Sequence, residues 1–486
     1  MKKNQSGTVF SNLIWRLLER TGAQGVTFVV SIVLARLLDP AVYGLVALVT
    51  VFTTLMQVFV DSGMGSALIQ KKDADDLDFS SVFYFNLVMC SLLYVGMFFA
   101  APLIANFYEK PELVPLVRVM SLILIISGLK NIQQAYVSKH LMFKKFFFAT
   151  LGGTIGAAAI GIFLAYKGFG VWALVAQNLF NATVDTIILW ITVKWRPKWM
   201  FSFQRLKGLL SYGWKLLASA LLDTGYKELR QLIIGKLYTS EDLAFYNKGS
   251  QFPKLIVTNV NASIDSVLLP TMSKEQDNRD RVRAMTRRAI KTSTFIMMPL
   301  MMGLAVCAEP LVRLAITEKW LPAVFFLRIF CFTYAFYPIH TANLNAIKAV
   351  GRSDLFLKLE IIKKVLGLAV LVATMFISVE AMALSLLFTS ICSQVVNSWP
   401  NKKLLGYSYF DQLKDMLPQI GLSCLMGGIV YCVHFLGLND WLTLLIQVPL
   451  GGIIYIGGSK LFHIDSFEYV LGILKGYLKK KKTKDA

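Results

Sequence analysis

Residues 80–106 read SSVFYFNLVMCSLLYVGMFFAAPLIAN and contain no acidic, basic or histidine side chain. A helix of this length rises about 40 Å, whereas the hydrocarbon core of a bilayer is about 30 Å thick. A helix satisfies its backbone amides internally, so this segment can cross hydrocarbon without exposing unpaired polar groups. The stretch therefore predicts a membrane-spanning helix.

The composition of the whole chain extends this prediction to a polytopic, all-α membrane protein. Of the 486 residues, 56% are hydrophobic and 16% are charged, whereas soluble domains carry about 25% charged residues. A water-soluble protein could not bury so much apolar surface, which excludes a cytosolic globular enzyme. We expect fourteen transmembrane helices, at residues 12–38, 42–69, 80–106, 114–138, 146–166, 169–193, 208–236, 244–272, 289–317, 321–347, 354–377, 380–400, 412–436 and 440–462.

The net charge of +21 is concentrated in alternate loops, such as 194–207 and 274–291, and in the C-terminal tail. Basic loops face the cytoplasm in membrane proteins, so we expect both termini to be cytoplasmic and the number of spans to be even. The tail should contact anionic lipids, and no nucleic-acid partner is needed to explain the charge. We expect the segment KWRPKWMFSFQRLKGLL, from Lys194, to form an amphipathic helix in the membrane interface.

Short segments recur in the same order about 200 residues apart. DPAVY at residues 39–43 is similar to DLAFY at 242–246, and the VDS triplet that contains Asp61 is similar to the IDS triplet that contains Asp265. Such self-similarity indicates a parallel repeat of two bundles. We expect an N-terminal six-helix bundle at 1–200, a C-terminal six-helix bundle at 201–405, two additional helices at 406–465 and a basic cytoplasmic tail at 466–486.

Three segments resemble a known superfamily: WRLLERTGAQG at residues 15–25, LARLLDPAVYG at 34–44 and DSGMGSALIQ at 61–70. They are similar to the polysaccharide-transport branch of the multidrug/oligosaccharidyl-lipid/polysaccharide exporter superfamily, and most of all to its Wzx-like lipopolysaccharide and colanic-acid exporters. The resemblance implies two six-helix bundles plus two C-terminal helices.

The resemblance also implies a function in transport. Members of this branch move undecaprenyl-diphosphate-linked sugar repeat units, for O-antigen, exopolysaccharide or capsule, across the bacterial inner membrane by alternating access. It implies no catalytic residue, and polysaccharide polymerase or export proteins are the expected protein partners. The histidines are scattered and no phosphate-binding Gly-Lys-Ser/Thr loop is present, so we expect neither a metal site nor a cofactor.

Ionisable residues within the expected spans are the candidates for the substrate site, because a charge there costs about 2.5–3.5 kcal/mol or more unless it is paired or hydrated. A lipid diphosphate is an anion, and arginine and lysine bind phosphate oxygens well. Residues 16, 20 and 24 recur every four positions and so share one helix face. The candidates for a cationic cavity are Arg16, Arg20, Gln24, Lys215, Lys227, Arg230 and Arg328. For those near span ends, the alternative is that they snorkel to the headgroups.

Three acidic residues are candidates for coupling transport to an ion gradient: Asp223, Asp61 and Asp265. Asp61 and Asp265 occupy equivalent positions in the repeat. A capping or loop-pairing role is the alternative for these two.

Two other functions compete with the transport of a lipid-linked sugar. A cation-coupled multidrug or metabolite antiporter of the same superfamily would share the fold but would need a more apolar or acidic cavity than these lysines and arginines provide. A membrane enzyme acting on sugar nucleotides would need a large external loop or a cytoplasmic cluster of acids for a metal. The expected loops offer neither, so we expect a transporter and no enzyme.

Overall fold

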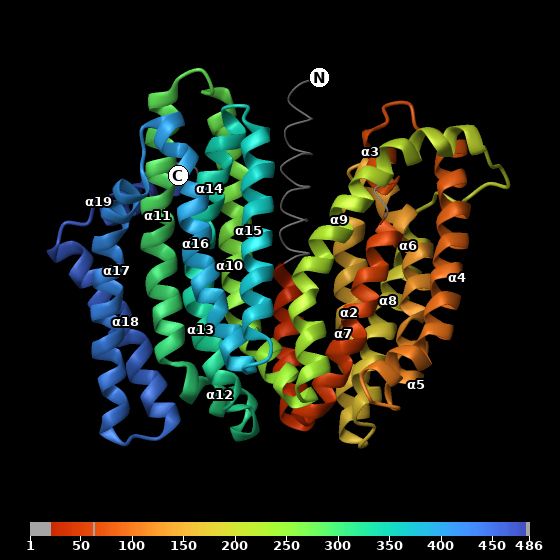
Figure 1. The fold of residues 1–486 in the computed structure, drawn as a ribbon, viewed down its shortest axis with the longest axis horizontal. Coiled ribbons are helices and arrows are strands. Elements are labelled where there is room, and N and C mark those ends of the chain that lie inside the picture. The colour runs from red at the N-terminus through yellow and green to blue at the C-terminus, as the bar shows by residue number, and fades with distance from the viewer. Residues whose placement is uncertain (1–20, 62–63, 483–486) are drawn as a thin grey trace. The chain divides into compact units, whose positions relative to one another are not determined.

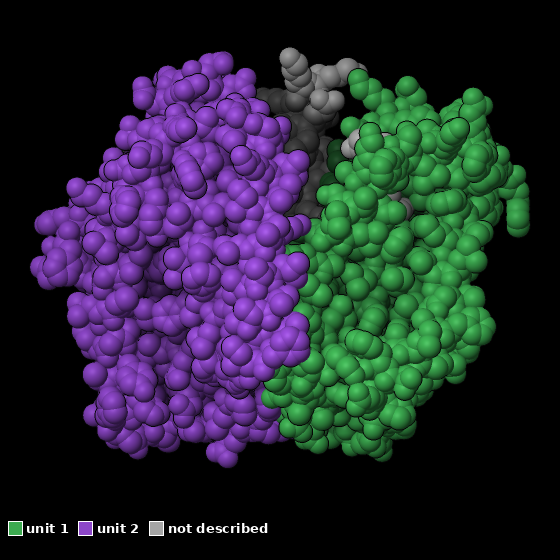
Figure 2. Space-filling model, viewed as in Figure 1, with its two compact units in different colours: residues 1–244 green, residues 245–486 purple. Residues whose placement is uncertain are grey.

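The computed structural model describes residues 21–61 and 64–482, and within them every regular element is a helix (Figure 1). In chain order these are Thr21–Leu37, α2 (Pro40–Asp61), α3 (Met64–Gln70), α4 (Asp76–Phe107), α5 (Leu113–Met120), α6 (Leu122–Lys139), α7 (Phe143–Tyr166), α8 (Val171–Thr192), α9 (Phe203–Leu237), α10 (Ser240–Lys274), α11 (Arg279–Val306), α12 (Ala308–Ile316), η1 (Glu318–Trp320), α13 (Ala323–Ala335), α14 (Tyr337–Ala349), α15 (Ser353–Thr374), α16 (Val379–Leu405), α17 (Tyr409–Cys432), η2 (Val433–Leu436), α18 (Asp440–Leu461) and α19 (Asp465–Lys482). Figure 2 colours the two compact units into which the chain divides, residues 1–244 (unit 1) and 245–486 (unit 2).

Eleven helical segments of the described chain are long and apolar enough to cross a membrane. This confirms the expectation of an all-α polytopic membrane protein. The first, seventh and eleventh expected spans coincide with the helix Thr21–Leu37, α9 and α15, which are shorter or more charged than the eleven. The count of fourteen therefore stays a prediction.

The ninth expected span, 289–317, crosses a helix break. Helix α11 ends at Val306 and α12 begins at Ala308, with Cys307 between them. Pro310 lies in the first turn of α12, where its missing N–H costs nothing, whereas an uninterrupted helix would lose a hydrogen bond there.

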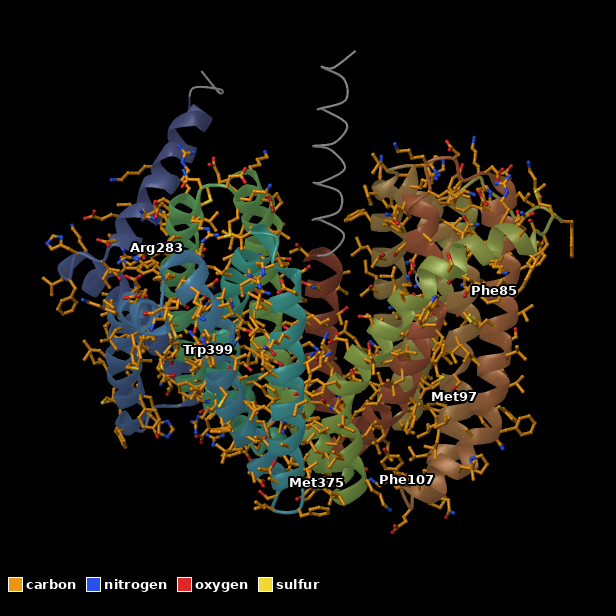
Figure 3. The ribbon with its side chains drawn as sticks, turned by 45° about the horizontal axis from the view of Figure 1, so that its top comes forward. Phe85, Met97, Phe107, Arg283, Met375 and Trp399 are labelled. Atoms are coloured by element: carbon orange, nitrogen blue, oxygen red, sulfur yellow. The ribbon has the colours of Figure 1, made fainter. Side chains whose placement is uncertain are left out.

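Unit 1 is held by close helix pairs. The tightest is α7 with α8, where the Gly153 backbone comes so near α8 that a Cβ would lie 3.0 Å from the Asn181 carbonyl oxygen. Small residues allow this approach, which is the usual basis of helix association in membranes. Figure 3 shows Phe85, Met97 and Phe107 following one another along α4, with Phe107 at its end.

The segment after α8 corrects one expectation. The prediction of an amphipathic helix from Lys194 is wrong, because the chain from Val193 to Ser202 is not helical and α9 starts at Phe203. Pro197 disfavours helix at the residue before it. Trp195 is buried, and its indole N–H donates to Asp76 Oδ1 at 3.0 Å. The Ser202 side chain then caps α9 by accepting from the Arg205 amide.

Unit 2 uses helix pairs that correspond to those of unit 1. In unit 1, α4 packs on α5 and α6, and α8 packs on both α6 and α7. In unit 2, α11 packs in the same way on α13 and α14, and α16 packs on both α14 and α15. In addition, α11 packs along α17, and α17 along α18. Within unit 1, α9 packs on α2, α3 and α4. The expected domain bounds of 1–200, 201–405, 406–465 and 466–486 stay predictions.

Buried amides lock the interior of unit 2. Asn343 of α14 exchanges hydrogen bonds with Gln412 of α17, both at 2.9 Å, and accepts a third from Asn401 of α16 at 2.7 Å. All three side chains are buried. Three helices therefore meet in one polar contact, which fixes their register more specifically than apolar packing alone.

We predict that Gly44→Ala destabilises unit 1. A Cβ at Gly44 of α2 would lie 1.8 Å from the Ser240 carbonyl oxygen, a backbone atom that cannot rotate away. Overpacking of this kind costs about 1–3 kcal/mol, so the thermal midpoint of the purified protein in detergent should fall. Gly96→Ala in α4 is the control, because a Cβ there meets nothing within 4 Å. Equal midpoints for the two variants would contradict the tight contact at Gly44.

Candidate functional site

The first polar site in unit 1 surrounds Asp61, at the end of α2. Asn131 of α6 donates its Nδ2 to Asp61 Oδ1 at 3.1 Å and to the Val60 carbonyl at 3.3 Å. The side chain of Gln57, one turn earlier, also hydrogen-bonds Asp61. Asp61 is thus held by two amides that belong to two different helices.

A charged pair lies next to this site. Lys130, which precedes Asn131 on α6, forms an ion pair with Asp185 of α8 at 3.1 Å, and both side chains are largely buried. The other oxygen of Asp185 is buried without a hydrogen-bond partner among the described residues. Helix α6 therefore presents an amide to the acid of α2 and a cation to the acid of α8. Sequence reasoning missed Lys130, although a lysine within an expected span is a signal in itself.

Unit 2 contains the counterpart of the Asp61 site. Asn345 of α14 donates to Asp265 Oδ1 of α10 at 2.8 Å. One turn earlier on both helices, the Thr341 hydroxyl donates to Asn261 Oδ1 at 2.7 Å. The two repeat-related aspartates thus accept from asparagines on corresponding helices, which supports a pairing role. Their role in ion coupling stays a prediction.

Helix α9 carries the expected cations of the seventh span, and it brings two candidates of opposite charge together. Lys227 Nζ lies 2.5 Å from Asp223 Oδ2, with the two side chains 68% and 44% exposed. Lys215, earlier on the same helix, is exposed, and Arg230 is half-buried. Asp223 and Lys227 are four residues apart and therefore share one face of the helix.

Arg328 of α13 has a backbone partner. Its Nε donates to the Ala305 carbonyl at 3.2 Å, where α11 ends and carbonyls lack helical partners. Unit 1 has an analogue: Arg118 Nε donates to the Phe98 carbonyl at 3.3 Å. Pro102 has no N–H to offer that carbonyl. Both arginines therefore satisfy carbonyls freed at a helix irregularity.

The expected cluster of the first span is only partly visible. Gln24 lies half-buried on the helix Thr21–Leu37, whereas Arg16 and Arg20 lie outside the described residues. A further lysine was missed by sequence reasoning: Lys248 of α10 is only 6% exposed, and its Nζ lies 5.4 Å from the ring centre of buried Trp320. Its place near the start of an expected span hid it, because lysines there usually reach the interface.

In residues 21–61 and 64–482, no three histidine, cysteine or carboxylate side chains are grouped so as to hold a metal ion. The polar contacts between helices described above are made chiefly by amides, carboxylates and cations. Such groups bind and orient charged solutes and move protons.

The helices, their length and the polar pairs between them define a multi-pass membrane protein of helical bundles. A model of the family described as "Polysaccharide biosynthesis protein" matches residues 33–325. The chain belongs to this family, which confirms the resemblance to the polysaccharide-transport branch of the exporter superfamily.

Two curated relatives and one solved structure illustrate the family. The chain is 24% identical to the teichuronic acid biosynthesis protein TuaB of Bacillus subtilis (strain 168), over 83% of this chain and 85% of that protein. It is 26% identical to the succinoglycan biosynthesis transport protein ExoT of Rhizobium meliloti (strain 1021), over 64% of this chain and 63% of that protein. Its fold is similar to that of the lipid II flippase MurJ in an inward closed conformation, with a TM-score of 0.76 and 16% identity over 93% of this chain and 99% of that chain.

We predict that Lys130→Ala lowers both the yield and the thermal midpoint of the protein. Removing one partner of a buried ion pair leaves the other charge unpaired and costs about 3–5 kcal/mol. The double variant Lys130→Ala/Asp185→Ala should recover much of the loss, since no charge is then left alone. Exposed Lys72→Ala serves as the control. A double variant that is no more stable than Lys130→Ala would show that the pair is not what holds α6 and α8.

Proposed function

We propose that this protein moves a lipid-linked oligosaccharide, carried on a polyprenyl diphosphate, from the cytoplasmic to the outer leaflet of the bacterial inner membrane. The observation that carries the proposal is membership of the polysaccharide biosynthesis family in a chain with the helical fold of a lipid II flippase. The name of one relative contains the words "biosynthesis transport protein", and that of another places it in the synthesis of a cell-surface polymer.

The substrate chemistry matches the cations of α9. A diphosphate headgroup with attached sugars cannot enter hydrocarbon bare, so it must travel along a hydrated, polar surface. Lys215, Lys227 and Arg230 offer positive charges along one helix, with Arg16, Arg20 and Gln24 of the first span proposed to complete the set. Such cations favour an anionic lipid over the organic cations that a multidrug antiporter exports.

The salt bridge between Lys227 and Asp223 suits a binding role. Exposed ion pairs are worth about 0–1 kcal/mol, so Lys227 can exchange its carboxylate partner for a phosphate at little cost. Asp223 would then be released to take up a proton or another cation, which makes it the preferred coupling residue. Arg328 is the weakest of the proposed binding residues, because its Nε already donates to Ala305.

In this proposal the protein makes no covalent change in its substrate and works by alternating access. Both termini face the cytoplasm. The glycan is an O-antigen, exopolysaccharide or capsule repeat unit, and the protein partners are a polymerase or export proteins that receive it on the outer side. Asp61 and Asp265 remain secondary candidates for coupling.

We predict that Lys227→Ala slows the flipping of a fluorescent polyprenyl-diphosphate sugar in proteoliposomes by about tenfold or more. One hydrogen bond to a charged group is worth about 1.5–3 kcal/mol, and about 1.4 kcal/mol corresponds to a tenfold change. Arg36→Ala is the control, because this exposed arginine lies at the end of its helix and outside the proposed set; its rate should stay within about twofold of the unaltered protein.

The double variant Asp223→Ala/Lys227→Ala separates binding from pairing. If Lys227 binds substrate, the double variant is as slow as Lys227→Ala. Recovery of the rate in the double variant would mean that Lys227 serves only to neutralise Asp223. A Lys227→Ala rate equal to that of Arg36→Ala, at equal protein content, would remove this lysine from the site.

A further inference from the structure

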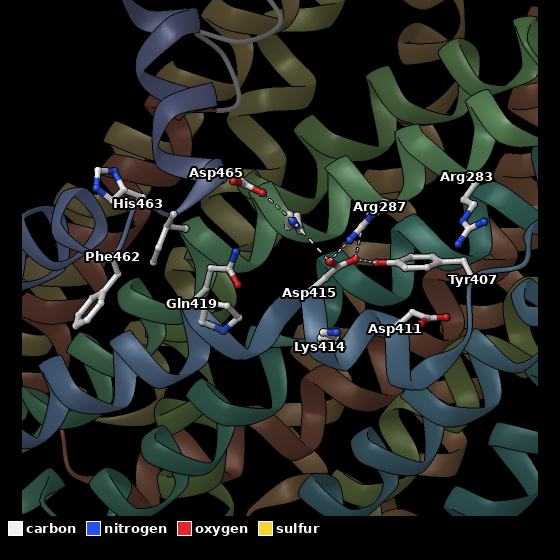
Figure 4. Close-up of a pocket in the computed structure, with 13 residues that line it drawn as sticks. Arg283, Arg287, Tyr407, Asp411, Lys414, Asp415, Gln419, Phe462, His463 and Asp465 are labelled. Atoms are coloured by element: carbon white, nitrogen blue, oxygen red, sulfur yellow. Dashed lines mark hydrogen bonds and ion pairs between the residues drawn. The ribbon is translucent and has the colours of Figure 1, made fainter.

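Unit 2 has a cavity that the transport proposal does not use. It has a volume of about 410 Å³ and is lined by α11, α17 and the turn between α18 and α19 (Figure 4). A second space of about 600 Å³ lies between α11 and α19. Arg287, Lys291 and Asp465 line both, so the two spaces are neighbours on either side of these side chains.

The acid at the centre of the first cavity is fully neutralised. Arg287 binds Asp415 with two hydrogen bonds, of 2.6 and 2.7 Å, and Lys291 lies 3.5 Å from the same carboxylate. The Tyr407 hydroxyl donates to it at 2.8 Å, and burial raises the pKa of Tyr407, which keeps that proton in place. Lys291 also reaches Asp465 at 3.1 Å. These groups brace α11 against α17 and the start of α19.

Three further cations around the cavities form no ion pair with the acids of the lining. Arg283 and Lys414 line the first cavity and Arg288 lines the second, and within residues 21–61 and 64–482 none of them has a hydrogen bond or ion pair. Arg288 instead stacks on Tyr469 of α19, at 4.4 Å from the ring centre. Asp411, the acid nearest in sequence to Lys414, caps α17 by accepting from the amide and hydroxyl of Ser408, and its carboxylate also interacts electrostatically with Arg283.

The remaining balance of charge suits an anion. The two linings together carry five cations, Arg283, Arg287, Arg288, Lys291 and Lys414, against four acids, Asp411, Asp415, Asp465 and Glu468, which leaves one positive charge in excess. Guanidinium and ammonium groups that form no ion pair can bind phosphate oxygens through charge-assisted hydrogen bonds.

The apolar rim identifies the kind of anion. The span α18 ends at Leu461, directly before the turn that lines the cavity, so the cavity lies where hydrocarbon gives way to headgroups. Leu461 and Phe462 are 74% and 63% exposed, and Tyr469 is 41% exposed. A free phosphate ion gains nothing from such a rim, whereas the glycerol and acyl chains of a lipid do.

We propose that the two neighbouring cavities bind the headgroup of an anionic membrane phospholipid. Arg283, Lys414 and Arg288 donate to its phosphate oxygens, and Phe462 and Tyr469 contact its glycerol and upper acyl chains. The bound lipid fills the joint between α11, α17 and α19 and stabilises the C-terminal helices of unit 2. The site involves none of the residues proposed to bind the transported lipid.

The test uses the full-length protein purified in a neutral detergent. Added phosphatidylglycerol should raise its thermal midpoint by about 3 °C or more, since a ligand that binds only the folded state stabilises it. Phosphatidylcholine, inorganic phosphate and glycerol phosphate should not. Native mass spectrometry counts the phosphatidylglycerol molecules retained, and this number does not depend on the stability of a variant.

The variant Arg283→Gln/Arg288→Gln/Lys414→Gln should lose the thermal shift and one retained lipid. Its charge-matched control is Lys274→Gln/Lys402→Gln/Lys403→Gln, three exposed lysines of unit 2 outside the cavities, which should keep both. Equal loss in the two variants would show general surface attraction and overturn the proposal. Protection of the unaltered protein by inorganic phosphate as strong as that by phosphatidylglycerol would also overturn it, in favour of a simple anion site.

Discussion

Hydrocarbon offers no hydrogen-bond partners, and this one constraint accounts for the polar contacts in both units. Each charge, amide or freed carbonyl in a span has to be satisfied by another part of the protein or by water. Asp61 is satisfied by Asn131, and Asp265 by Asn345. The same requirement explains why Arg118 donates to a carbonyl that Pro102 leaves without an N–H.

The same constraint implies that charges exposed within a span face water and not lipid. The Asp223–Lys227 pair lies well inside a 35-residue helix, yet the lysine side chain is 68% exposed and the aspartate side chain 44%. Facing lipid, such a pair would be costly, and facing water it is nearly neutral in free energy. This difference is the physical reason to assign that face of α9 to a hydrated path for a charged headgroup, and to assign the buried pairs, such as Lys130 with Asp185, to holding the helices together.

The sequence was informative where a property is local. Apolar segments predicted the helices, and short repeated sequence segments predicted that Asp61 and Asp265 are equivalent. Their matching asparagine partners support this equivalence. Partners distant in the chain could not be predicted: Asp185 lies 55 residues from Lys130, and no pattern of spacing links them. The expected helix at Lys194 failed because an amphipathic pattern was outweighed by Pro197 and by burial of Trp195. Lys248 was missed because its burial results from packing against Trp320, a residue far away in the sequence.

A similar ion-paired contact occurs in both units with acid and base exchanged between the helices, and in unit 2 it lies beside the cationic cavity. In unit 1 the acid belongs to α4: buried Asp78 binds Lys71 and also Arg205 of α9, which packs on α4. In unit 2 the base belongs to the corresponding helix, since Arg287 of α11 binds Asp415 of α17. Helix α4 begins with acids that pair with the nearby cations. The first turns of α11 are rich in arginine, and their cations outnumber the acids that α17 and α19 supply to the cavities. The headgroup of an anionic lipid, as proposed above, would balance this excess of positive charge at the end of the bundle.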